Sequence, residues 1–377
     1  MALPPLSLYI HIPWCERKCP YCDFNSHQQE GHLPEAEYVA ALLRDLDRDL
    51  PLAQGRPLVS IFIGGGTPSL LSVPSLQSLL DGVRARLALD PDCEITLEAN
   101  PGSAEAEKFA GFVAAGINRI SLGVQSFDDD CLRALGRVHD AAQARSAVAI
   151  AQASGIDSLN IDLMHGLPDQ TAAMAEADLR QALDFAPAHL SWYQLTIERN
   201  TAFYKRPPEL PVEDALGEIQ ARGEALLAAA DYTNYEVSAY ARPGFRCRHN
   251  LNYWEFGDYL GIGAGAHGKL TLPEAGEIRR TVKRRQPAEY LAAEDANARG
   301  QVLDRRDLPG DFMLNALRLT EGFAPGLYSA RTGLALETAM PTLESLAARD
   351  LLDVSAERIC PTPLGRRYLD SVVSEFL

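Results

Sequence analysis

The chain has 377 residues, of which 46% are hydrophobic and 23% are charged, values typical of a globular protein with one large domain and a smaller one. Its formal net charge of −16 argues against a nucleic-acid partner, because phosphate binding requires a basic surface. No apolar run reaches the eighteen or so residues of a membrane span, and the N-terminus lacks the features of a signal peptide. We therefore expect a cytoplasmic protein without a transmembrane segment.

Short β-branched runs alternate with longer amphipathic segments over the first 240 residues. The predicted strands are 7–12, 58–63, 94–99, 119–124, 158–164 and 190–195. The predicted helices are 35–50, 74–87, 104–115, stretches that end at 153, 171–184 and 212–230. This alternation is typical of an α/β fold, a parallel sheet covered by crossover helices. Six such units predict a partial barrel rather than the closed barrel of eight.

The pattern changes after residue 240. Residues 241–304 are rich in glycine and aromatic residues and are expected to connect two domains. Within them, "EIRRTVKRR" (277–285) indicates a solvated basic face or, alternatively, an anchor for a carboxylated ligand or an acidic partner.

Residues 305–377 are predicted to be mostly helical. They end in the order helix, two short strands, helix, which is similar to a winged-helix module. The segment "LESLAARDLL" has no excess of positive charge, so we expect a docking or lid domain rather than a nucleic-acid reader. The predicted domains are therefore 1–240, 241–304 and 305–377.

Three of the seven cysteines are clustered in "CERKCPYC": Cys15, Cys19 and Cys22. Three thiolates on one tight loop can bind three irons of a [4Fe-4S] cluster and leave the fourth iron open. Zinc is the alternative, but zinc sites usually combine two Cys-x-x-Cys pairs, and the chain has no second pair.

This Cys-x-x-x-Cys-x-x-Cys loop after a first strand, with Tyr21 before the last cysteine, resembles the signature of the radical S-adenosylmethionine (SAM) enzymes. The resemblance implies a radical SAM (β/α)6 core with a smaller C-terminal domain. It also implies that the open iron binds SAM, and that an external reductant drives its cleavage to a 5′-deoxyadenosyl radical.

Polar and glycine residues follow the successive predicted strands, at the end where β/α enzymes place their chemistry. They are Gly65, Gly66, Thr67, Glu98, Gln125, Arg137 and Asp162. Glycines allow close approach to a ligand, and a carboxylate can accept hydrogen bonds from a ribose. Together these positions resemble the SAM contacts of the coproporphyrinogen-oxidase branch of the family, and the resemblance adds Tyr9 and Tyr21.

That branch contains oxygen-independent coproporphyrinogen III oxidases and HemW-type heme chaperones. The oxidases carry another cysteine two residues after the third, where this chain has Phe24, and a longer segment before the first strand. The chaperones carry a His-Asn-x-x-Tyr-Trp motif linked to heme, which "HNLNYW" (249–254) matches. The resemblance therefore implies a heme chaperone with His249, Tyr253 and Trp254 at the heme site and Cys247 as a further candidate ligand.

The expected partners are heme, a reductant for the cluster and heme-acceptor proteins, with membrane-associated hemoproteins as candidates. Acceptors of that kind would place the protein in the cytoplasm or at the membrane periphery. One alternative is an active coproporphyrinogen III oxidase, and another is a radical SAM enzyme for an unrelated substrate in which His249 is structural. The sequence leaves open whether SAM is cleaved, and it assigns no catalytic residue.

Overall fold

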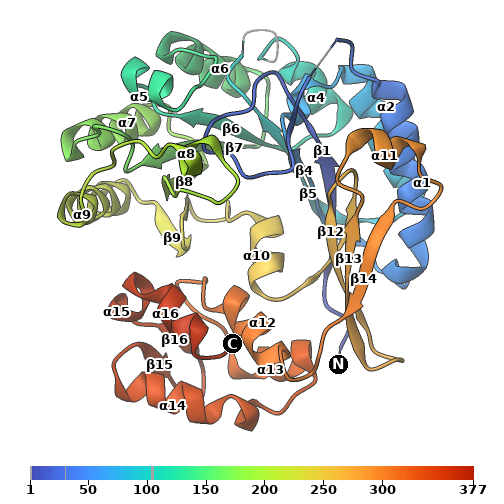
Figure 1. Cartoon of the computed structure of the whole chain (residues 1–377), viewed down its shortest axis with the longest axis vertical. Coiled ribbons are helices and arrows are strands. Elements are labelled where there is room, and N and C mark those ends of the chain that lie inside the picture. The colour runs from blue at the N-terminus through green and yellow to red at the C-terminus, as the bar shows by residue number, and fades with distance from the viewer. Residues whose placement is uncertain (1, 30, 103–105) are drawn as a thin grey trace.

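One large sheet organises the chain in the computed structural model, which describes residues 2–29, 31–102 and 106–377 (Figure 1). Six parallel strands form its centre. They are β1 (Leu6–Ile12), β4 (Leu58–Gly65), β5 (Leu89–Ala99), β6 (Arg119–Gln125), β7 (Ser158–His165) and β8 (His189–Gln194). Each contains most or all of one strand predicted from the sequence, in the predicted order.

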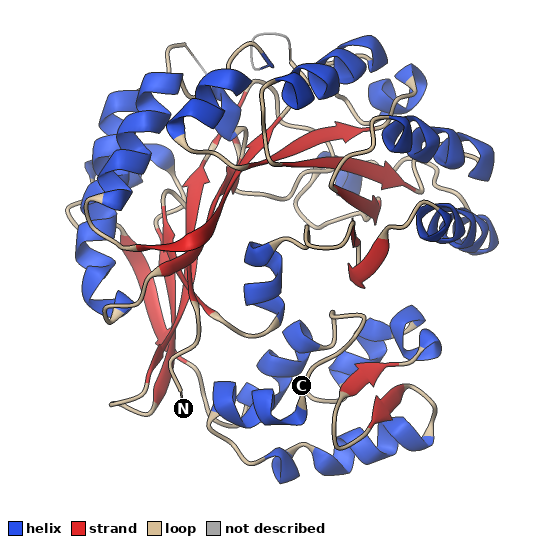
Figure 2. Ribbon diagram, turned by 180° about the vertical axis from the view of Figure 1, so that it is seen from behind, coloured by secondary structure: helices blue, strands red, loops and turns tan. Residues whose placement is uncertain are grey.

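Helices cover the outer face of this arc, and its inner face turns toward the C-terminal part of the chain (Figure 2). They are α1 (Glu35–Ala53), α2 (Val73–Arg84), α4 (Phe109–Ala115), α5 (Asp129–Ala134), α6 (Ala141–Ala153), α7 (Ala172–Asp184) and α9 (Glu213–Ala229). The short helix α8 (Ala202–Lys205) lies instead beside the cysteine loop, where the Phe203 amide donates to the Pro20 carbonyl at 3.0 Å. Of the predicted helix 104–115, residues 104 and 105 lie outside the described residues. The remaining predicted helices are confirmed, and local signals explain several starts, such as the capping box of Asp140 and Gln143 before α6.

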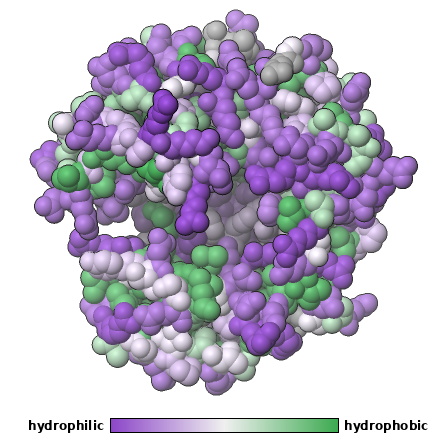
Figure 3. Space-filling model, in the orientation of Figure 1, coloured by the Kyte–Doolittle hydropathy of each residue, from purple (hydrophilic) through white to green (hydrophobic). Residues whose placement is uncertain are grey.

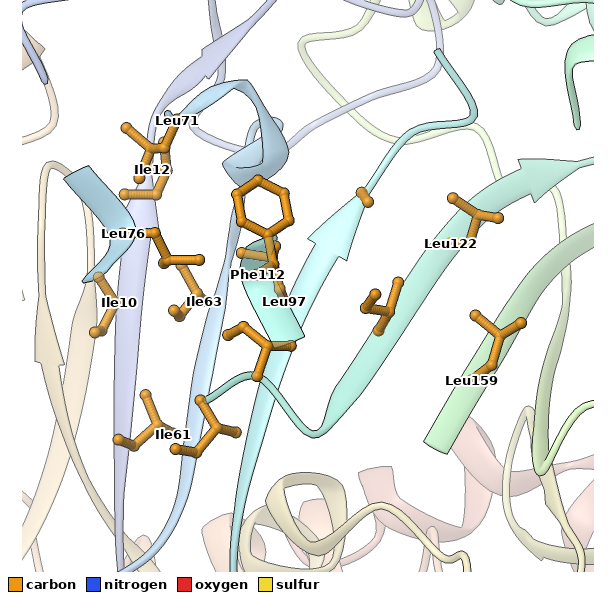
Figure 4. Close-up of a cluster of buried hydrophobic side chains, with 14 of the residues drawn as sticks. Ile10, Ile12, Ile61, Ile63, Leu71, Leu76, Leu97, Phe112, Leu122 and Leu159 are labelled. Atoms are coloured by element: carbon orange, nitrogen blue, oxygen red, sulfur yellow. The ribbon is translucent and has the colours of Figure 1, made fainter. Parts of the chain in front are cut away.

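The main core lies between the sheet and these helices. Alternate residues of β1 (Leu6, Leu8, Ile10 and Ile12) are fully buried on this side. They pack with Ile61 and Ile63 of β4 and with helix residues such as Leu76 and Phe112 (Figure 4). Because side chains alternate along a strand, Ser7, Tyr9 and His11 of β1 lie on the inner face.

Residues 241–304 extend the sheet beyond β1. β11 (Asp258–Ile262) pairs with β1 in parallel. The antiparallel strands β12 (His267–Leu272), β13 (Glu277–Lys283) and β14 (Asn297–Val302) follow, with α11 (Pro287–Ala292) between the last two. The segment expected to connect two domains therefore contributes four strands to the central sheet.

The interpretation of "EIRRTVKRR" as a solvated basic face is wrong for Lys283. Its side chain is fully buried, and its ammonium lies 2.7 Å from both Asp45 and Asp49 of α1. A buried ammonium requires such partners. Arg280 of the same strand pairs with Asp311 at 2.8 Å, so these charges bind other parts of the chain.

At the opposite edge, β10 (Ala239–Ala241) pairs with β8 and β9 (Thr233–Glu236). The short helix α10 (Arg248–Trp254) lies against the inner face of the sheet (Figure 1). The Asn252 amide holds it there by donating to the Ser7 hydroxyl and to the Asp258 carbonyl, each at 2.9 Å.

The C-terminal part packs around its own apolar cluster, which includes Phe312, Leu343 and Leu346. Its elements are α12 (Leu308–Ala316), α13 (Pro325–Thr332), α14 (Met340–Ala348), β15 (Leu352–Val354), β16 (Ile359–Pro361), α15 (Pro363–Arg367) and α16 (Leu369–Ser374). The predicted order of helix, two strands and helix is present. No helix among the described residues has the length and apolar character needed to cross a membrane.

Candidate functional site

The cysteine loop follows β1 directly and is folded back on itself. The two-residue strands β2 (Trp14–Cys15) and β3 (His27–Gln28) pair in parallel across its base. The Lys18 ammonium donates to the carbonyls of Phe24 and Ser26, each at 3.1 Å. These contacts hold Cys15, Cys19 and Cys22 on one side of a closed loop, with each side chain partly exposed.

Distant parts of the chain fix the position of this loop. The Asn25 amide donates to the carbonyl of Ala264 at 2.9 Å and to that of Arg285 at 2.8 Å. The imidazole of His11 donates to the Asn25 carbonyl at 2.9 Å. The loop therefore depends on the extended part of the sheet as well as on its own sequence.

The three thiols share one pocket of about 150 Å³ with the residues at the strand ends. Of the predicted site residues, the pocket is lined by Cys15, Cys19, Tyr21, Cys22, Gly65, Gly66, Thr67, Glu98, Gln125, Arg137 and Asp162. Tyr9 does not line it; its hydroxyl lies 2.9 Å from the Nδ1 of His11, beneath the pocket. Phe24, whose side chain is 60% exposed, lies at the pocket rim.

The glycines at the end of β4 bring two backbones into contact. The amides of Gly66 and Thr67 donate to the carbonyls of Ile12 and Trp14, both at 2.7 Å. A Cβ at Gly66 would lie 2.4 Å from the Trp14 carbonyl oxygen, so a side chain there would displace the cysteine loop. Gly65 has a φ of +115°, which is also accessible mainly to glycine.

A chain of hydrogen bonds leads from Thr67 to the cysteine loop. The Asn100 amide donates to the Thr67 hydroxyl at 2.9 Å, and its carbonyl accepts from Arg137 at 2.6 Å. The same guanidinium lies 3.5 Å from the Cys19 sulfur. A buried cation beside a sulfur stabilises a thiolate, the form that binds metal.

Two carboxyl groups lie deeper in the pocket. Glu98 accepts a hydrogen bond from the Gly65 amide at 3.0 Å. Burial, together with the nearby Asp162 carboxylate, raises the pKa of Glu98 to about 7. Burial also raises the pKa of Asp162, which accepts from Ser121 at 2.9 Å and from Asn160 at 2.8 Å. Both groups can accept hydrogen bonds from a polar ligand.

The thiols fit an iron–sulfur cluster better than a single metal ion. Among the described residues, no three Cys, His, Asp or Glu side chains lie close enough together to hold one ion. The cysteines of a [4Fe-4S] cluster each bind a different iron and therefore stand further apart. Three thiols from one loop around a shared pocket match that arrangement.

The His-Asn-x-x-Tyr-Trp motif forms α10, and its first histidine is buried in an aromatic stack. The His249 ring lies 4.6 Å from that of Phe62 and 4.7 Å from that of Tyr253, between ring centroids. Its Nδ1 has no hydrogen-bond partner among the described residues. Burial, with the charge of Arg119, lowers the pKa of His249 to about 3, so the imidazole is neutral.

The other motif residues lie on different sides of α10. The Tyr253 ring stacks on that of Tyr259 at 4.1 Å. Trp254 faces the C-terminal domain, where the Arg318 guanidinium lies 4.5 Å from its ring centroid. The Cys247 thiol is fully buried and donates to Glu94 at 3.3 Å. The structure therefore keeps His249 and Cys247 away from the open surface and places Trp254 at the domain boundary.

One hydrogen-bond network joins the pocket to the start of α10. Asn160 donates to Asp162 at 2.8 Å and accepts from the ring of His189 at 2.6 Å. The other nitrogen of His189 accepts from the Tyr235 hydroxyl at 2.8 Å, which in turn accepts from the Cys247 amide at 3.2 Å. The pocket and the motif helix therefore share a continuous buried network.

Several pocket residues were not predicted from the sequence. Asn100, Ser121 and Tyr193 line the pocket, and the Tyr193 hydroxyl donates to Gln125 at 2.8 Å. A signal for them exists, because polar residues recur at alternate positions in otherwise apolar strands, as in Ser121 and Gln125 of β6. That alternation marks the inner face of the sheet.

Family models match both parts of the chain. A model described as the radical SAM superfamily matches residues 9–182, and one described as the HemN C-terminal domain matches residues 303–368.

Full-length relatives and one solved structure are also similar. The heme chaperone HemW of Escherichia coli (strain K12) is 53% identical over 375 residues, covering 100% of this chain and 99% of that protein. The heme chaperone HemW of Haemophilus influenzae is 51% identical over 379 residues, covering 100% and 98%. The structure of coproporphyrinogen III oxidase (HemN) from Escherichia coli has a TM-score of 0.83 at 24% identity, covering 99% of this chain and 90% of that one. At that identity the structural likeness concerns the fold alone.

Proposed function

Because this chain belongs to the HemW family of radical SAM proteins, we propose that it is a heme chaperone, which binds heme and transfers it to acceptor proteins. The full-length similarity to relatives named heme chaperones carries this proposal. The radical SAM fold predicted from the sequence, with its C-terminal helical domain, is confirmed by the family models and by the match to HemN.

The cofactors of the superfamily are a [4Fe-4S] cluster and SAM. We propose that Cys15, Cys19 and Cys22 bind the cluster, since all three line one pocket. When bound and reduced, the cluster supplies an electron for SAM chemistry. The Arg137 guanidinium, 3.5 Å from the Cys19 sulfur, would donate a hydrogen bond to that sulfur when it binds iron.

Residues on the other walls of the pocket are proposed to hold SAM. They are Tyr21, Gly65, Gly66, Thr67, Glu98, Gln125, Arg137 and Asp162. Glu98 and Asp162 would accept hydrogen bonds from hydroxyl or amino groups of SAM, because carboxylates are strong acceptors. Tyr9 lies outside the lining of this pocket and would act through its hydrogen bond to His11.

His249 remains the candidate iron ligand of the heme. The neutral ring and the unpartnered nitrogen support this assignment, because neutral imidazole is the form that ligates iron. Tyr253 and Trp254 would pack on the macrocycle. Cys247 is the weaker candidate, because burial raises the pKa of its thiol to about 12 and keeps it protonated. Since His249 is 6% exposed, ligation requires that the aromatic stack around it opens.

The partners follow from this role. A chaperone must meet proteins that receive heme, and we propose membrane-associated hemoproteins as acceptors. The protein would then work in the cytoplasm, at times at the membrane periphery.

The experiment is an anaerobic titration of heme into reconstituted protein, followed by Soret absorbance, beside the variant His249→Ala. The matched control is His165→Ala. His165 is also buried, and its ring centroid lies 4.2 Å from that of Trp192. Its Nδ1 has no hydrogen-bond partner among residues 2–29, 31–102 and 106–377, and burial lowers its pKa to about 4. We expect saturable binding of about one heme per chain that weakens only in the His249 variant.

Two other outcomes have clear meanings. Equal weakening in both histidine variants would refute the role of His249 and leave heme binding in place. If no saturable heme binding were found and the protein converted coproporphyrinogen III to protoporphyrinogen IX, it would be an oxidase and not a chaperone.

A further inference from the structure

A second and larger cavity lies between α9 and the C-terminal domain. Its volume is about 740 Å³, against about 150 Å³ for the pocket at the cysteines. In the space-filling view it corresponds to the gap at the left edge, between the upper body and the lower domain (Figure 3). A volume of this size is typical of sites for cofactor-sized ligands.

The floor of this cleft is held by contacts between the two domains. Glu236 of β9 forms a backbone bridge with Leu319, and the Thr320 hydroxyl donates to Asn234 at 3.2 Å. The Thr320 amide also donates to the Tyr235 carbonyl at 3.0 Å. The walls are therefore fixed relative to each other before a ligand arrives, which lowers the entropic cost of binding.

The two walls carry opposite charges. Arg366 and Arg367, in the last turn of α15, project from the C-terminal domain, and Glu213 and Glu224 lie on α9. Both arginines are exposed, and in the part of the chain that the structure describes neither forms an ion pair. Two arginines that are neighbours in the sequence and line one cleft can bind the carboxylates of a ligand.

Apolar and aromatic side chains lie between the charged walls. Val237 is 48% exposed and Leu369 is partly exposed, whereas Leu319, Tyr232 and Tyr240 are buried beneath them. Val237 and Leu369 form a short apolar strip that a ring system can contact with one face. A polyphosphate or nucleic acid would meet the acidic wall of α9 without a compensating apolar contact.

We propose that this cleft receives the heme cargo, with its two propionates on Arg366 and Arg367 and its ring against the apolar strip. The inference rests on the proposed function and adds a docking place for the cargo on the protein surface, distinct from the buried His249 that is proposed to ligate its iron. The acidic wall orients the ligand, because it repels the propionate edge toward the arginines.

The cleft is joined to the HNLNYW motif through one side chain. Arg318 lines the cleft and at the same time stacks on the Trp254 ring at 4.5 Å. Trp254 is the last residue of α10, the helix that also carries His249. A ligand that contacts Arg318 is therefore one side chain away from Trp254 at the end of the motif helix.

The test compares Arg366→Ala/Arg367→Ala with wild type and with Arg299→Ala/Arg306→Ala, in the full-length reconstituted protein. The control pair is also exposed and removes the same charge, but it lies outside the cleft. The probes are hemin and hemin dimethyl ester, in which both propionates are esterified. Since each charge-assisted hydrogen bond contributes substantially, we expect about tenfold or greater weakening of hemin binding in the cleft variant only. The ester should bind wild type and the cleft variant equally weakly.

Equal hemin affinity in the cleft variant and wild type would overturn the proposal that heme docks in the cleft and would leave the chaperone proposal intact. The same weakening in both arginine pairs would also overturn it, because the effect would then come from net charge. Only a wild-type protein that binds no hemin would remove the proposed function itself. Circular dichroism checks that all variants are folded.

Discussion

Replacing Glu98 with glutamine should make the protein without SAM more stable at neutral pH. The carboxyl is held in the pocket wall, with the Gly65 amide as its hydrogen-bond donor at 3.0 Å. Burial and the Asp162 charge raise its pKa from 4.5 to about 7. A neutral amide of nearly the same shape keeps the hydrogen bond and removes the buried charge.

The magnitude follows from the linkage between protonation and folding. The folded protein binds the Glu98 proton more tightly than the unfolded chain, so this group favours folding below pH 4.5, and that contribution is lost as pH rises toward 7. At about 1.4 kcal/mol per pH unit, the ionised carboxyl costs at most about 3 kcal/mol at pH 7 and above. Glutamine does not titrate, so the variant avoids this cost.

The assay is urea unfolding of both proteins between pH 5 and pH 8, with the exposed Glu344→Gln as control. We expect the difference in free energy of unfolding between Glu98→Gln and wild type to grow by about 2–3 kcal/mol over this range. A difference that stays constant with pH would refute the reasoning, since the carboxyl would then titrate alike in both states.

The same substitution should weaken SAM binding. A carboxylate forms charge-assisted hydrogen bonds that are roughly twice as strong as those of an amide, so we expect about tenfold lower affinity by calorimetry. Unchanged SAM affinity would refute the assignment of Glu98 to the SAM site. Gain of stability with loss of binding is the pattern of a residue kept for function.

Three further substitutions test the cluster, the sheet and the motif helix. Cys19→Ala should abolish most of the iron and sulfide content after anaerobic reconstitution, and full content would refute its role as a ligand. Lys283→Met leaves Asp45 and Asp49 buried without a cation. We expect the free energy of unfolding, measured in urea, to fall by about 3–5 kcal/mol. A loss below about 1 kcal/mol would contradict the pairing of Lys283 with these carboxylates. Glu94→Ala removes the acceptor for two backbone amides at the start of α10. We expect faster amide hydrogen exchange there and a free energy of unfolding that is lower by about 1–3 kcal/mol. Unchanged exchange would show that the carboxylate does not hold the helix.

The sequence predicted the central sheet well because its signals are local. Buried parallel strands need apolar side chains on the outer face, and runs such as "SLYIHI" and "LVSIFI" supply them. The strand-end residues were found for a related reason. Parallel strands end at the same edge, so residues far apart in the chain, such as Glu98 and Asp162, line one pocket.

The strands β11–β14 escaped prediction because ion pairs bury their polar residues. Lys269 and Lys283 are buried in the sheet beside Asp258 and Asp45, respectively. A lysine is predicted to be exposed unless its acidic partner is known, and Asp45, a partner of Lys283, is 238 positions away. The burial of His249 was hidden in the same way, because Phe62 of a distant strand supplies one side of its stack.

The anchoring of the cysteine loop determines when that loop can take its final form during synthesis. Asn25 bonds to carbonyls 239 and 260 positions further along the chain, and β1 completes its pairing only with β11. A nascent chain emerges from its N-terminus, so the thiols leave the ribosome long before the segment that fixes them. Closing so long a loop is slow. The three cysteines therefore lack their final neighbours until most of the protein has been made, and we expect any cluster that they bind to be inserted at a late stage of biogenesis.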